Sequence, residues 1–580
     1  MKQRDPSASR AGTRSRAKAR PWSATAALLW LLALSAWLGW ALPASAQQTA
    51  AIASAHPLAT AAGHDVLRRG GNAFDAAVAV AATLAVVEPY SSGLGGGGFW
   101  LLHRSDDGFQ TMVDGREMAP EAARAEQYLG ADGRPLSGAT TRGGKAAAIP
   151  GVPAAMAHVS QRYGRLPFAA VLAPAIALAR DGFPVDPRYV RITQLRERLL
   201  QAGIGTAAIF LDRDRAPGSG YVLRQPDLAV TLELLAREGA AGFYSGSVAR
   251  ALVASVNAAG GLWRLEDLTH YRVIERPPVR FEYRGAHITA AALPSAGGIA
   301  LAQALGMLQQ FPLRDMAGAD TAHFVVEALR RTFRDRALHL GDPDFVRVPR
   351  ERLLDPAYLK ERAASIDAAA ATRSEAPPDA ETRRSESVNT THLSVIDELG
   401  NRVAATLTIN LLFGSGIVAE GTGVLLNNEM DDFSLREDLP NSFLLRGGSA
   451  NAIAPGKRPL SSMTPTFVED RKGVLVLGAP GGARIVSQVL LAVLDYVHSP
   501  SVDLARLTGM PRYHHQFWPD RVETEPGGFS DEWRNALRAR GHEVRDAQRQ
   551  WGNMQVVFKS RATGLAEAAS DPRGGDVAWY

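Results

Sequence analysis

The sequence predicts a protein of the α+β class with a large buried core. Residues 50–360 mix helical and strand-like patterns, and a pair of alternating strands begins directly after residue 390. With 46% hydrophobic and 21% charged residues, the chain has the composition of an ordinary globular protein and not of a disordered one. At 580 residues it is long enough for two or more domains or for one large layered assembly.

The positive charge of the chain is concentrated at its beginning. Residues 1–20 contain seven Lys or Arg residues against the single acidic residue Asp5, so this segment alone carries +6. The formal charge of the whole chain is +5, which leaves about −1 for the remaining residues. Because the body of the protein is not basic, we do not expect it to bind nucleic acid.

The N-terminal segment predicts export. Its basic residues precede the apolar run ATAALLWLLALSAWLGWAL and then Ala44-Ser45-Ala46, which is the pattern of a secretory signal peptide over residues 1–46. We therefore expect a periplasmic or secreted protein. The apolar run could also span a bilayer, so an uncleaved anchor is the alternative and would be the only membrane contact. The absence of cysteine excludes a disulfide framework, a thiolate nucleophile and a lipid-modified cysteine.

Helical patterns are clearest before residue 360. Residues 56–90 predict two helices that are rich in small residues and broken at Gly70-Gly71. Another helix is predicted within residues 321–345, where apolar residues recur every four positions and glycine and proline follow the last turn.

The chain changes character near residue 390. Residues 362–388 are rich in Ala, Ser, Arg and acidic residues and have little to bury, so their composition predicts a mobile surface tether. HLSVID at residues 392–397 and RVAATLTINLLF at residues 402–413 follow, joined by a turn at Leu399-Gly400-Asn401. This pattern predicts a strand pair of the kind that builds a central sheet.

Two glycine-rich stretches invite an anion-binding interpretation. GLGGGG at residues 93–98 satisfies G-x-G-x-x-G, but a helical pattern precedes it and a strand follows, which is the reverse of a dinucleotide site. We expect these glycines to allow a close approach of packed backbones. Gly481 and Gly482 precede the apolar helix RIVSQVLLAVLDYV and fit either a tight turn or two N–H groups that face an anion.

Three polar clusters are candidates for a binding site. Ser461 and Ser462 lie beside two basic residues in KRPLSSMTP, which alone resembles a polar loop. NNEMDDFS carries three acidic residues within four positions but lacks the ligand spacing of a calcium loop. The pair His514-His515 has no further Cys, His or Glu at ligand spacing, so we interpret it as structural and predict no metal site.

Thr390 stands where the tether meets the first strand. No neighbouring side chain in the sequence could serve as its base. A threonine carries its own base when it is the first residue of a chain, because its α-amine, with a pKa of roughly 7.7–8.0, can take the hydroxyl proton. A cut between Asn389 and Thr390 would create that N-terminus. The alternative is the ordinary β-propensity of Thr-Thr at the start of a strand.

Long motifs distributed over nearly the whole chain after the signal segment identify a family. They are GGNAFDAAVA, VVEPYSSGLGGGGF, DGREMAP, AAIPGVPAAM, LPSAGG, GDPDF, TTHLSVID, FGSGIVAEGTGVLLNNEMDDFS, NAIAPGKRPLSSMTPT and GAPGGARI. The set resembles the gamma-glutamyltransferase family. The resemblance implies the N-terminal nucleophile hydrolase fold, a four-layer αββα sandwich. It also implies a precursor that cuts itself into a large subunit, residues 47–389, and a small catalytic subunit, residues 390–580, which build the fold together.

The resemblance also implies which residues carry the chemistry. Thr390 of TTH corresponds to the nucleophile, exposed by a cut after Asn389. Thr408 of ATLTIN corresponds to the hydroxyl that orients it. Gly481 and Gly482 correspond to the donors that stabilise the oxyanion.

The remaining motifs imply a site for an α-amino acid group. A planar guanidinium suits bidentate binding of a carboxylate. The residues implied for the α-carboxylate are Arg116, Ser461 and Ser462, and those implied for the α-ammonium are Asn410, Glu429 and Asp432.

The implied reaction is a two-step acyl transfer without a cofactor. Thr390 attacks the γ-amide of glutathione or a related γ-glutamyl compound, and the resulting ester is taken by water, an amino acid or a dipeptide. Two departures from the family pattern bear on substrate range. Leu411-Leu412 replaces small hydroxyl residues, and Phe443, in a segment with the length of a pocket-covering lid, replaces a tyrosine of some members.

Two alternatives stay open from the sequence. Relatives on this fold deacylate glutaryl-type cephalosporins, although Asp432 favours a substrate with an α-amine. A non-catalytic periplasmic binding protein would explain a pocket but not Thr390 behind a tether.

Overall fold

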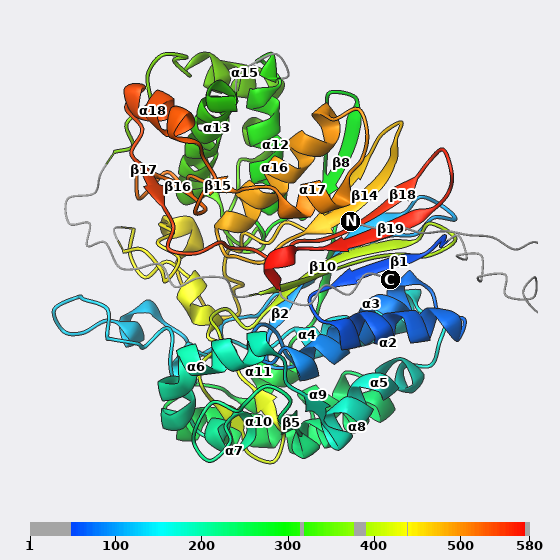
Figure 1. The fold of residues 1–580 in the computed structure, drawn as a ribbon. Coiled ribbons are helices and arrows are strands. Elements are labelled where there is room, and N and C mark those ends of the chain that lie inside the picture. Colours follow the sequence, from blue (N-terminus) through cyan, green and yellow to red (C-terminus); the bar gives the residue numbers. More distant parts are fainter. Residues whose placement is uncertain (1–47, 314–317, 376–389, 438, 575–580) are drawn as a thin grey trace, which may run out of the picture. The chain divides into compact units, whose positions relative to one another are not determined.

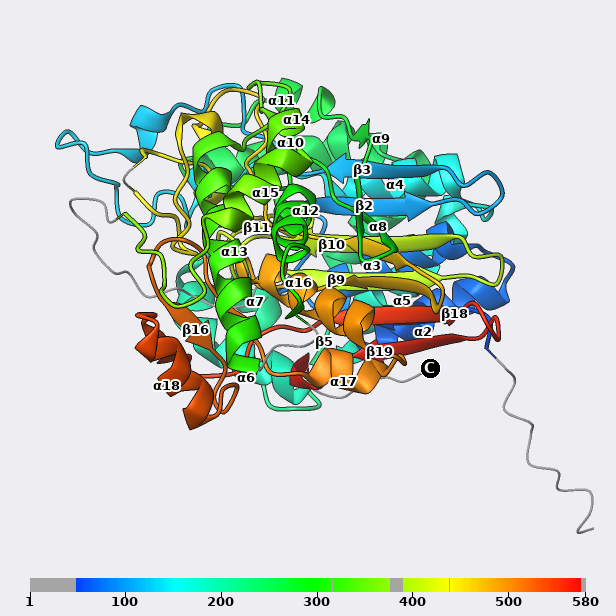
Figure 2. The same ribbon diagram turned by 90° about the horizontal axis from the view of Figure 1, so that it is seen from above.

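Two six-stranded antiparallel sheets lie at the centre of the molecule (Figure 1). The structure is a computed structural model that describes residues 48–313, 318–375, 390–437 and 439–574. The first sheet has the order β1-β9-β10-β2-β3-β6 and the second has the order β19-β18-β14-β13-β8-β7. The strands of the two sheets run in similar directions (Figure 2), as in aligned sheet packing.

Both sheets combine strands from before and after residue 390. The first contains β1 (Ala51–Ser54), β2 (Gly97–His103), β3 (Gln110–Gly115), β6 (Ile274–Arg276), β9 (Thr391–Ile396) and β10 (Arg402–Thr408). The second contains β7 (Val279–Tyr283), β8 (Ala286–Ala290), β13 (Thr466–Glu469), β14 (Gly473–Gly478), β18 (Gln555–Ser560) and β19 (Ala566–Ser570). In the first sheet, β9 and β10 lie between β1 and β2.

Helices cover the outer face of each sheet, which gives the four layers αββα (Figure 1). The first sheet is covered by α2 (Pro57–Arg68), α3 (Ala73–Val87), α4 (Val152–Tyr163) and α5 (Phe168–Asp181). The second is covered by α12 (Gly297–Leu308), α13 (Gly318–His339) and α16 (Arg484–His498). The fold expected from the family resemblance is therefore confirmed.

The described part of the chain contains further α-helices and several short strands. The helices are α6 (Pro187–Ala202), α7 (Thr206–Phe210), α8 (Pro226–Glu238), α9 (Ala241–Tyr244), α10 (Gly246–Ala258), α11 (Leu265–Thr269), α14 (Arg350–Leu353), α15 (Pro356–Ala364), α17 (Leu504–Gly509) and α18 (Asp531–Ala539). The short strands are β4 (Phe183–Pro184), β5 (Val222–Leu223), β11 (Val418–Ala419), β12 (Val424–Leu425), β15 (Tyr513–His514), β16 (Val522–Thr524) and β17 (Val544–Asp546).

The central strands are apolar on both faces because each face packs against another layer. Along β2, Phe99 and Leu101 belong to the cluster between the two sheets, whereas Trp100 and Leu102 belong to the cluster under α3. Successive side chains on a strand point to opposite faces, so a strand buried on both sides shows an unbroken apolar run. The run FWLLH in the sequence reflects this burial.

The main elements predicted from sequence patterns are confirmed. The two helices expected within residues 56–90 are α2 and α3, and the helix expected within residues 321–345 is α13. The strand pair after the tether is β9 and β10. The glycines of GLGGGG do allow a close approach, since a Cβ added to Gly96 would lie 2.0 Å from the carbonyl oxygen of Thr408.

Within the predicted tether, residues 362–375 make contacts with the rest of the protein that composition does not predict, although most of residues 365–375 are exposed. Residues 362–364 end α15, and Ala363 and Ile366 are buried in the core. Further on, Thr372 donates a 2.6 Å hydrogen bond to Glu327 of α13. Composition missed this packing because the partners of these small and polar residues come from distant parts of the chain. Residues 376–389 lie outside the described residues.

The predicted signal peptide, residues 1–46, also lies outside the described residues. Within the described ranges, no helix combines the length and the apolar character that a membrane span requires.

Candidate active site

Four neighbouring strands of the first sheet bring the candidate residues to one end of that sheet. The register pairs Thr391 of β9 with Leu407 of β10, and Thr408 with Gly97 of β2. The next pair is Gly98 of β2 with Gly115 of β3, directly before Arg116. The sheet therefore gathers Thr390, Thr408 and Arg116, which are far apart in the sequence.

Thr390 and Thr408 are hydrogen-bonded through their side chains. Their Oγ atoms lie 3.0 Å apart, and both residues are buried. The backbone N–H of Asn410 donates to Thr408 Oγ at 2.9 Å. One lone pair of Thr408 Oγ is therefore occupied, and either hydroxyl can donate in the contact between the two threonines. The contact holds Thr390 Oγ in place beside Thr408.

The backbone of Thr390 is strained. Its φ is +110°, in a region that β-branched residues rarely adopt. Such a conformation costs of order 1–3 kcal/mol and persists only where the surroundings impose it. The strain lies directly after the bond that the sequence analysis predicts to be cut.

His392 does not provide a base for Thr390. Its ring is hydrogen-bonded to Thr406 at 2.8 Å and to Ser394 at 3.1 Å. Complete burial lowers the pKa of His392 to about 3, so the ring stays neutral. Among the described residues, Thr408 is the one side chain that hydrogen-bonds the Thr390 hydroxyl. A free α-amine on Thr390 would supply the missing base.

Gly481 and Gly482 form a turn in front of α16. Gly481 has φ +131° and Gly482 has φ +58°, and their carbonyl oxygens accept hydrogen bonds from Arg484 and Ile485. Neither glycine N–H donates to another described residue. Phe443 packs on this turn, since a Cβ on Gly482 would lie 2.5 Å from its ring. The turn therefore leaves two donors available beneath an aromatic cover.

Arg116 is the centre of a buried charge cluster. Its Nη1 lies 2.5 Å from Glu429 Oε1 and its Nη2 lies 2.5 Å from Asp432 Oδ2. Its Nε donates to the carbonyl oxygen of Pro459 at 3.1 Å. The residues that the family resemblance implies for opposite ends of a substrate are thus in direct contact. Such a cluster suits a ligand that carries both charges on neighbouring atoms, as an α-amino acid does.

Glu117 is a further member of this cluster and was not among the residues predicted from the sequence. Its carboxylate is fully buried, lies 3.5 Å from Arg116 Nη1 and packs against Gly97, whose added Cβ would lie 2.3 Å from Glu117 Oε2. Burial raises the pKa of Glu117 to about 7, although Arg116 opposes the shift. Burial likewise raises the pKa of Glu429 well above its usual range. An acid directly beside the arginine in DGREMAP was the available signal.

Several polar atoms of this region are buried without a hydrogen-bond partner among the described residues. They include Ser462 Oγ, Glu429 Oε2 and both carboxylate oxygens of Glu117. By contrast, Ser461 Oγ accepts the N–H of Met463 at 3.1 Å. Buried polar atoms are normally satisfied, so Ser462 Oγ and Glu429 Oε2 retain capacity for a further polar partner.

The neighbouring acids Asp431 and Asp432 have different partners. Asp431 accepts hydrogen bonds from Thr140 Oγ at 2.8 Å and from the N–H of Ser442 at 3.0 Å, so it holds surrounding loops together. Asp432 faces Arg116 and also accepts from Asn441 Nδ2 at 3.1 Å. The amide of Asn410 donates to the carbonyl oxygen of Asn428 at 2.8 Å.

The His514-His515 pair lies apart from this cluster. His514 is hydrogen-bonded to Ser487 of α16 at 2.6 Å and His515 to Asp520 at 3.2 Å. Burial lowers the pKa of both histidines, to about 3 for His514 and about 4 for His515. Their contacts agree with the structural role predicted from the sequence.

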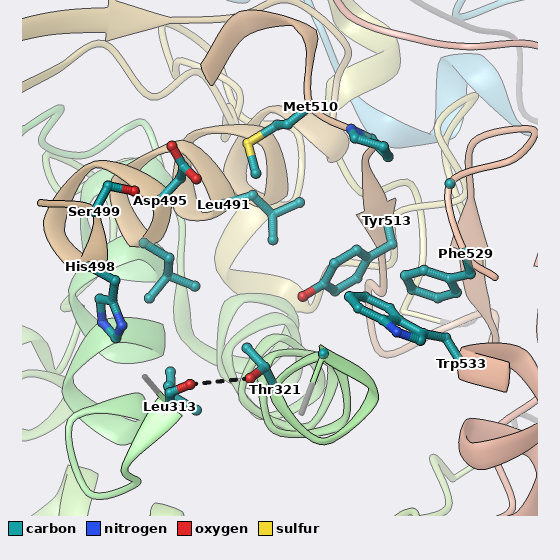
Figure 3. A pocket seen from close by; sticks show the side chains of 14 residues that line it. Leu313, Thr321, Leu491, Asp495, His498, Ser499, Met510, Tyr513, Phe529 and Trp533 are labelled. Atoms are coloured by element: carbon teal, nitrogen blue, oxygen red, sulfur yellow. Dashed lines mark hydrogen bonds between the residues drawn. The ribbon is translucent and has the colours of Figure 1, made fainter. Parts of the chain in front are cut away.

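A separate cavity of about 460 Å³ lies between α13, α16 and α18 (Figure 3). Tyr513, Phe529 and Trp533 form one wall, and Asp495 and His498 lie at the opposite end. None of the candidate catalytic or binding residues lines it. The cavity is therefore not part of the candidate active site.

Comparisons with known proteins agree with this geometry. A family model described as gamma-glutamyltranspeptidase matches residues 59–580. The chain is 40% identical over 534 residues to the glutathione hydrolase proenzyme of Escherichia coli K12, with 90% of each chain covered. It is 37% identical to the acylase ACY 1 proenzyme of Pseudomonas sp. V22, covering 87% of this chain and 88% of that one. Its structure is similar to cephalosporin acylase from Bacillus halodurans, with a TM-score of 0.79, 28% identity and coverage of 92% and 96%.

Proposed function

The chain belongs to the gamma-glutamyltranspeptidase family, and from this membership we propose that it transfers and hydrolyses γ-glutamyl groups of glutathione and related compounds through an ester on Thr390. The observation that carries the proposal is the Thr390–Thr408 hydroxyl pair at the end of the sheet whose strand β3 also positions Arg116, which contacts Glu429 and Asp432. A nucleophile and an α-amino acid site belong together in an enzyme that opens γ-glutamyl amides. The export signal of residues 1–46 supports action in the periplasm or outside the cell.

Maturation begins with the Thr390 hydroxyl. Its Oγ attacks the carbonyl carbon of Asn389, the peptide C–N bond breaks, and the nitrogen leaves as the α-amine of Thr390 while the acyl group becomes an ester. Water then hydrolyses the ester, which frees the hydroxyl and the carboxylate of Asn389. The strained φ of +110° at Thr390 supports this step, because cleavage releases the strain. The products are residues 47–389 and residues 390–580.

The new α-amine then serves as the base in catalysis. It takes the proton of Thr390 Oγ as the oxygen attacks the γ-carbonyl carbon of the substrate. The N–H groups of Gly481 and Gly482 receive the oxyanion, and a donor of this kind contributes roughly 3–4 kcal/mol to lowering a barrier. The proton passes to the leaving amine, and the γ-glutamyl group remains on Thr390. Water, an amino acid or a dipeptide then accepts it.

Substrate recognition uses the buried charge cluster. The α-carboxylate binds Arg116 with Ser461 and Ser462, and the α-ammonium binds Asn410, Glu429 and Asp432. The free Ser462 Oγ and Glu429 Oε2 support these assignments, because each has capacity for one more polar contact. A bound γ-glutamyl group replaces part of the direct contact between Arg116 and the acids with contacts of its own.

An acylase for glutaryl compounds is the second candidate, favoured by the similarity to cephalosporin acylase and by the apolar side chains of Leu411 and Phe443 near the site. Glu429 and Asp432 argue against an acylase activity, because a glutaryl group has no ammonium to pair with their carboxylates. Burying unpaired carboxylates costs several kcal/mol.

A paired comparison of wild type and Thr390→Ala tests the proposal. We expect purified wild type to run as two fragments, the smaller beginning with Thr390, and to release product from a γ-glutamyl anilide. Thr390→Ala should stay one chain without activity. An intact, fully active single chain in either preparation would reject Thr390 as the nucleophile, and Edman sequencing of the small fragment locates the cut.

A further inference from the structure

A buried carboxylate contacts the residue that follows Thr390. Glu88 comes directly after the last residue of α3 and is 0% exposed. Its Oε2 accepts a 2.8 Å hydrogen bond from Thr391 Oγ. Its Oε1 lies 3.1 Å from Arg188 Nη1 and accepts a 3.3 Å hydrogen bond from Tyr90. Among the described residues, every partner of this carboxylate is a side chain, and only Thr391 lies in the part of the chain after residue 390.

The position is electrostatically unfavourable without these partners. A carboxylate at the C-terminal end of a helix meets the negative end of the helix dipole, and burial adds a desolvation cost. Burial raises the pKa of Glu88, whereas Arg188 and the Thr391 hydroxyl lower it. Arg188 is itself held by a 3.3 Å hydrogen bond to the carbonyl oxygen of Gly574. Arg188 and Tyr90 thus help to hold the Glu88 carboxylate against the Thr391 hydroxyl.

The side chains of Thr390 and Thr391 have different partners on either side of the backbone. The Thr390 hydroxyl contacts Thr408 on one side, and the Thr391 hydroxyl contacts Glu88 on the other. The backbone between the two side chains carries the positive φ of Thr390. A strained conformation persists only where the surroundings impose it, and the Glu88 contact is one such restraint, beside the pairing of Thr391 with Leu407 in the sheet.

We propose that Glu88 is a positioning residue for the nucleophile: through the Thr391 hydroxyl it holds the backbone at residues 390–391 so that Thr390 Oγ points at the carbonyl that it attacks. This inference rests on the proposed role of Thr390. It extends that role to a residue of α3 that touches neither substrate nor the reacting atoms. After the cut, the same hydrogen bond joins the two fragments beside the new N-terminus.

The Thr391 side chain allows a matched pair of variants. Thr391→Val keeps the shape and removes the hydroxyl, and Thr391→Ser keeps the hydroxyl and removes a methyl group. We expect Thr391→Val to slow both self-cleavage and kcat by on the order of tenfold to a hundredfold, the effect of losing one hydrogen bond to a charged group. KM for a γ-glutamyl anilide should stay within about twofold, because the groups proposed to bind substrate are unchanged. Thr391→Ser should restore both rates to within about threefold of wild type.

Glu88→Gln tests whether the carboxylate acts through Thr391. Alone it should slow self-cleavage, but combined with Thr391→Val it should add little to the loss that Thr391→Val already causes. Thr83→Val is the control for losing a buried hydroxyl in the same layer. The Thr83 hydroxyl donates within α3 to the carbonyl oxygen of Ala79 at 2.8 Å, so its removal should leave the cleavage rate unchanged.

The measurements are the rate of fragment appearance on gels, kcat and KM of the processed enzyme, and the melting temperature. The inference would be overturned if Thr391→Val kept its rate of self-cleavage and its kcat within about threefold of wild type. It would also be overturned if these rates were as low in Thr391→Ser as in Thr391→Val. Thr390→Ala, measured in parallel, distinguishes failure of the proposed function from failure of the positioning role of Glu88. If it cuts normally, the proposed function has failed; if it stays uncut while Thr391→Val is normal, only the positioning role of Glu88 has failed.

Discussion

Arg116 Nη1 and Glu429 Oε1 lie 2.5 Å apart in a site where 313 positions separate the two residues in the sequence. With Asp432 on the other guanidinium nitrogen, the cation is already neutralised before any substrate arrives. A substrate must therefore offer both an anion and a cation in order to exchange these contacts without leaving a charge unpaired. We therefore expect the proposed site to prefer zwitterionic α-amino acid groups over simple acids.

Replacing Arg116 by Ala should mainly impair recognition of the α-carboxylate. We expect a loss in kcat/KM toward a γ-glutamyl anilide of order 2–5 kcal/mol, because the change also leaves the acidic partners unpaired. Arg116→Lys keeps the positive charge but lacks the planar guanidinium that binds a carboxylate through two hydrogen bonds, so it should recover only part of the lost kcat/KM. An unchanged kcat/KM in Arg116→Ala would remove this residue from the binding site.

Asp432→Asn should narrow the preference for γ-glutamyl over glutaryl substrates. In wild type we expect kcat/KM for the two anilides to differ by on the order of a hundredfold, because a glutaryl group leaves the acids without a cation. Asp431→Asn is the matched control, since Asp431 bonds to Thr140 and Ser442 instead of Arg116 and should leave the preference unchanged. If wild type prefers the glutaryl anilide, the acylase assignment replaces the γ-glutamyl one.

Glu117→Gln should change how stability depends on pH. The pKa of Glu117 is raised to about 7 in the folded protein from a reference of 4.5, so between these values the folded state binds more protons than the unfolded state. The contribution of Glu117 to stability is therefore fully present below pH 4.5 and is lost as the pH rises to about 7. We expect the melting temperature of Glu117→Gln, relative to wild type, to be higher at pH 8 than at pH 5 by a few degrees. An equal difference at both pH values would show that Glu117 keeps an ordinary pKa.

Phe443→Ala should favour hydrolysis over transfer. The Phe443 ring packs on Gly482, so its removal opens the proposed oxyanion turn to water. We expect the ratio of hydrolysis to transfer, measured with and without a dipeptide acceptor, to rise by roughly threefold or more. Leu445→Ala truncates another buried apolar residue of the same segment and serves as the control. A ratio that stays constant in Phe443→Ala, or rises equally in both variants, would argue against a specific cover over Gly482.

Local patterns predicted the elements that depend on local physics. The apolar periodicity of α13 and the alternation of β9 and β10 each reflect burial of a face, which sequence records directly. The position of Thr390 directly before β9 was also visible, because a change of composition marks it. The roles of the substrate-binding residues came from the family resemblance and stay predictions.

Contacts between distant segments could not be predicted in this way. Thr372 packs against α13 because Glu327 supplies an acceptor, and nothing in the composition of residues 362–375 records that partner. The Glu88–Thr391 bond likewise joins residues 303 positions apart. The contact between Glu117 and Arg116 is different, because these two residues are adjacent in the sequence. What could not be foreseen was its burial against Gly97, which follows from the register of β2 and β3.

The insertion of β9 and β10 between β1 and β2 sets a condition on recovery from denaturation. Before the cut, these strands reach their places within one chain, so folding is a first-order process. After the cut, the same sheet has to be assembled from two separate polypeptides, and the loop that brought them together is gone. Recovery of the denatured mature enzyme then becomes second-order and depends on protein concentration. The proposed self-cleavage would therefore replace a precursor that folds as one chain with an enzyme whose lifetime is set by its rate of unfolding.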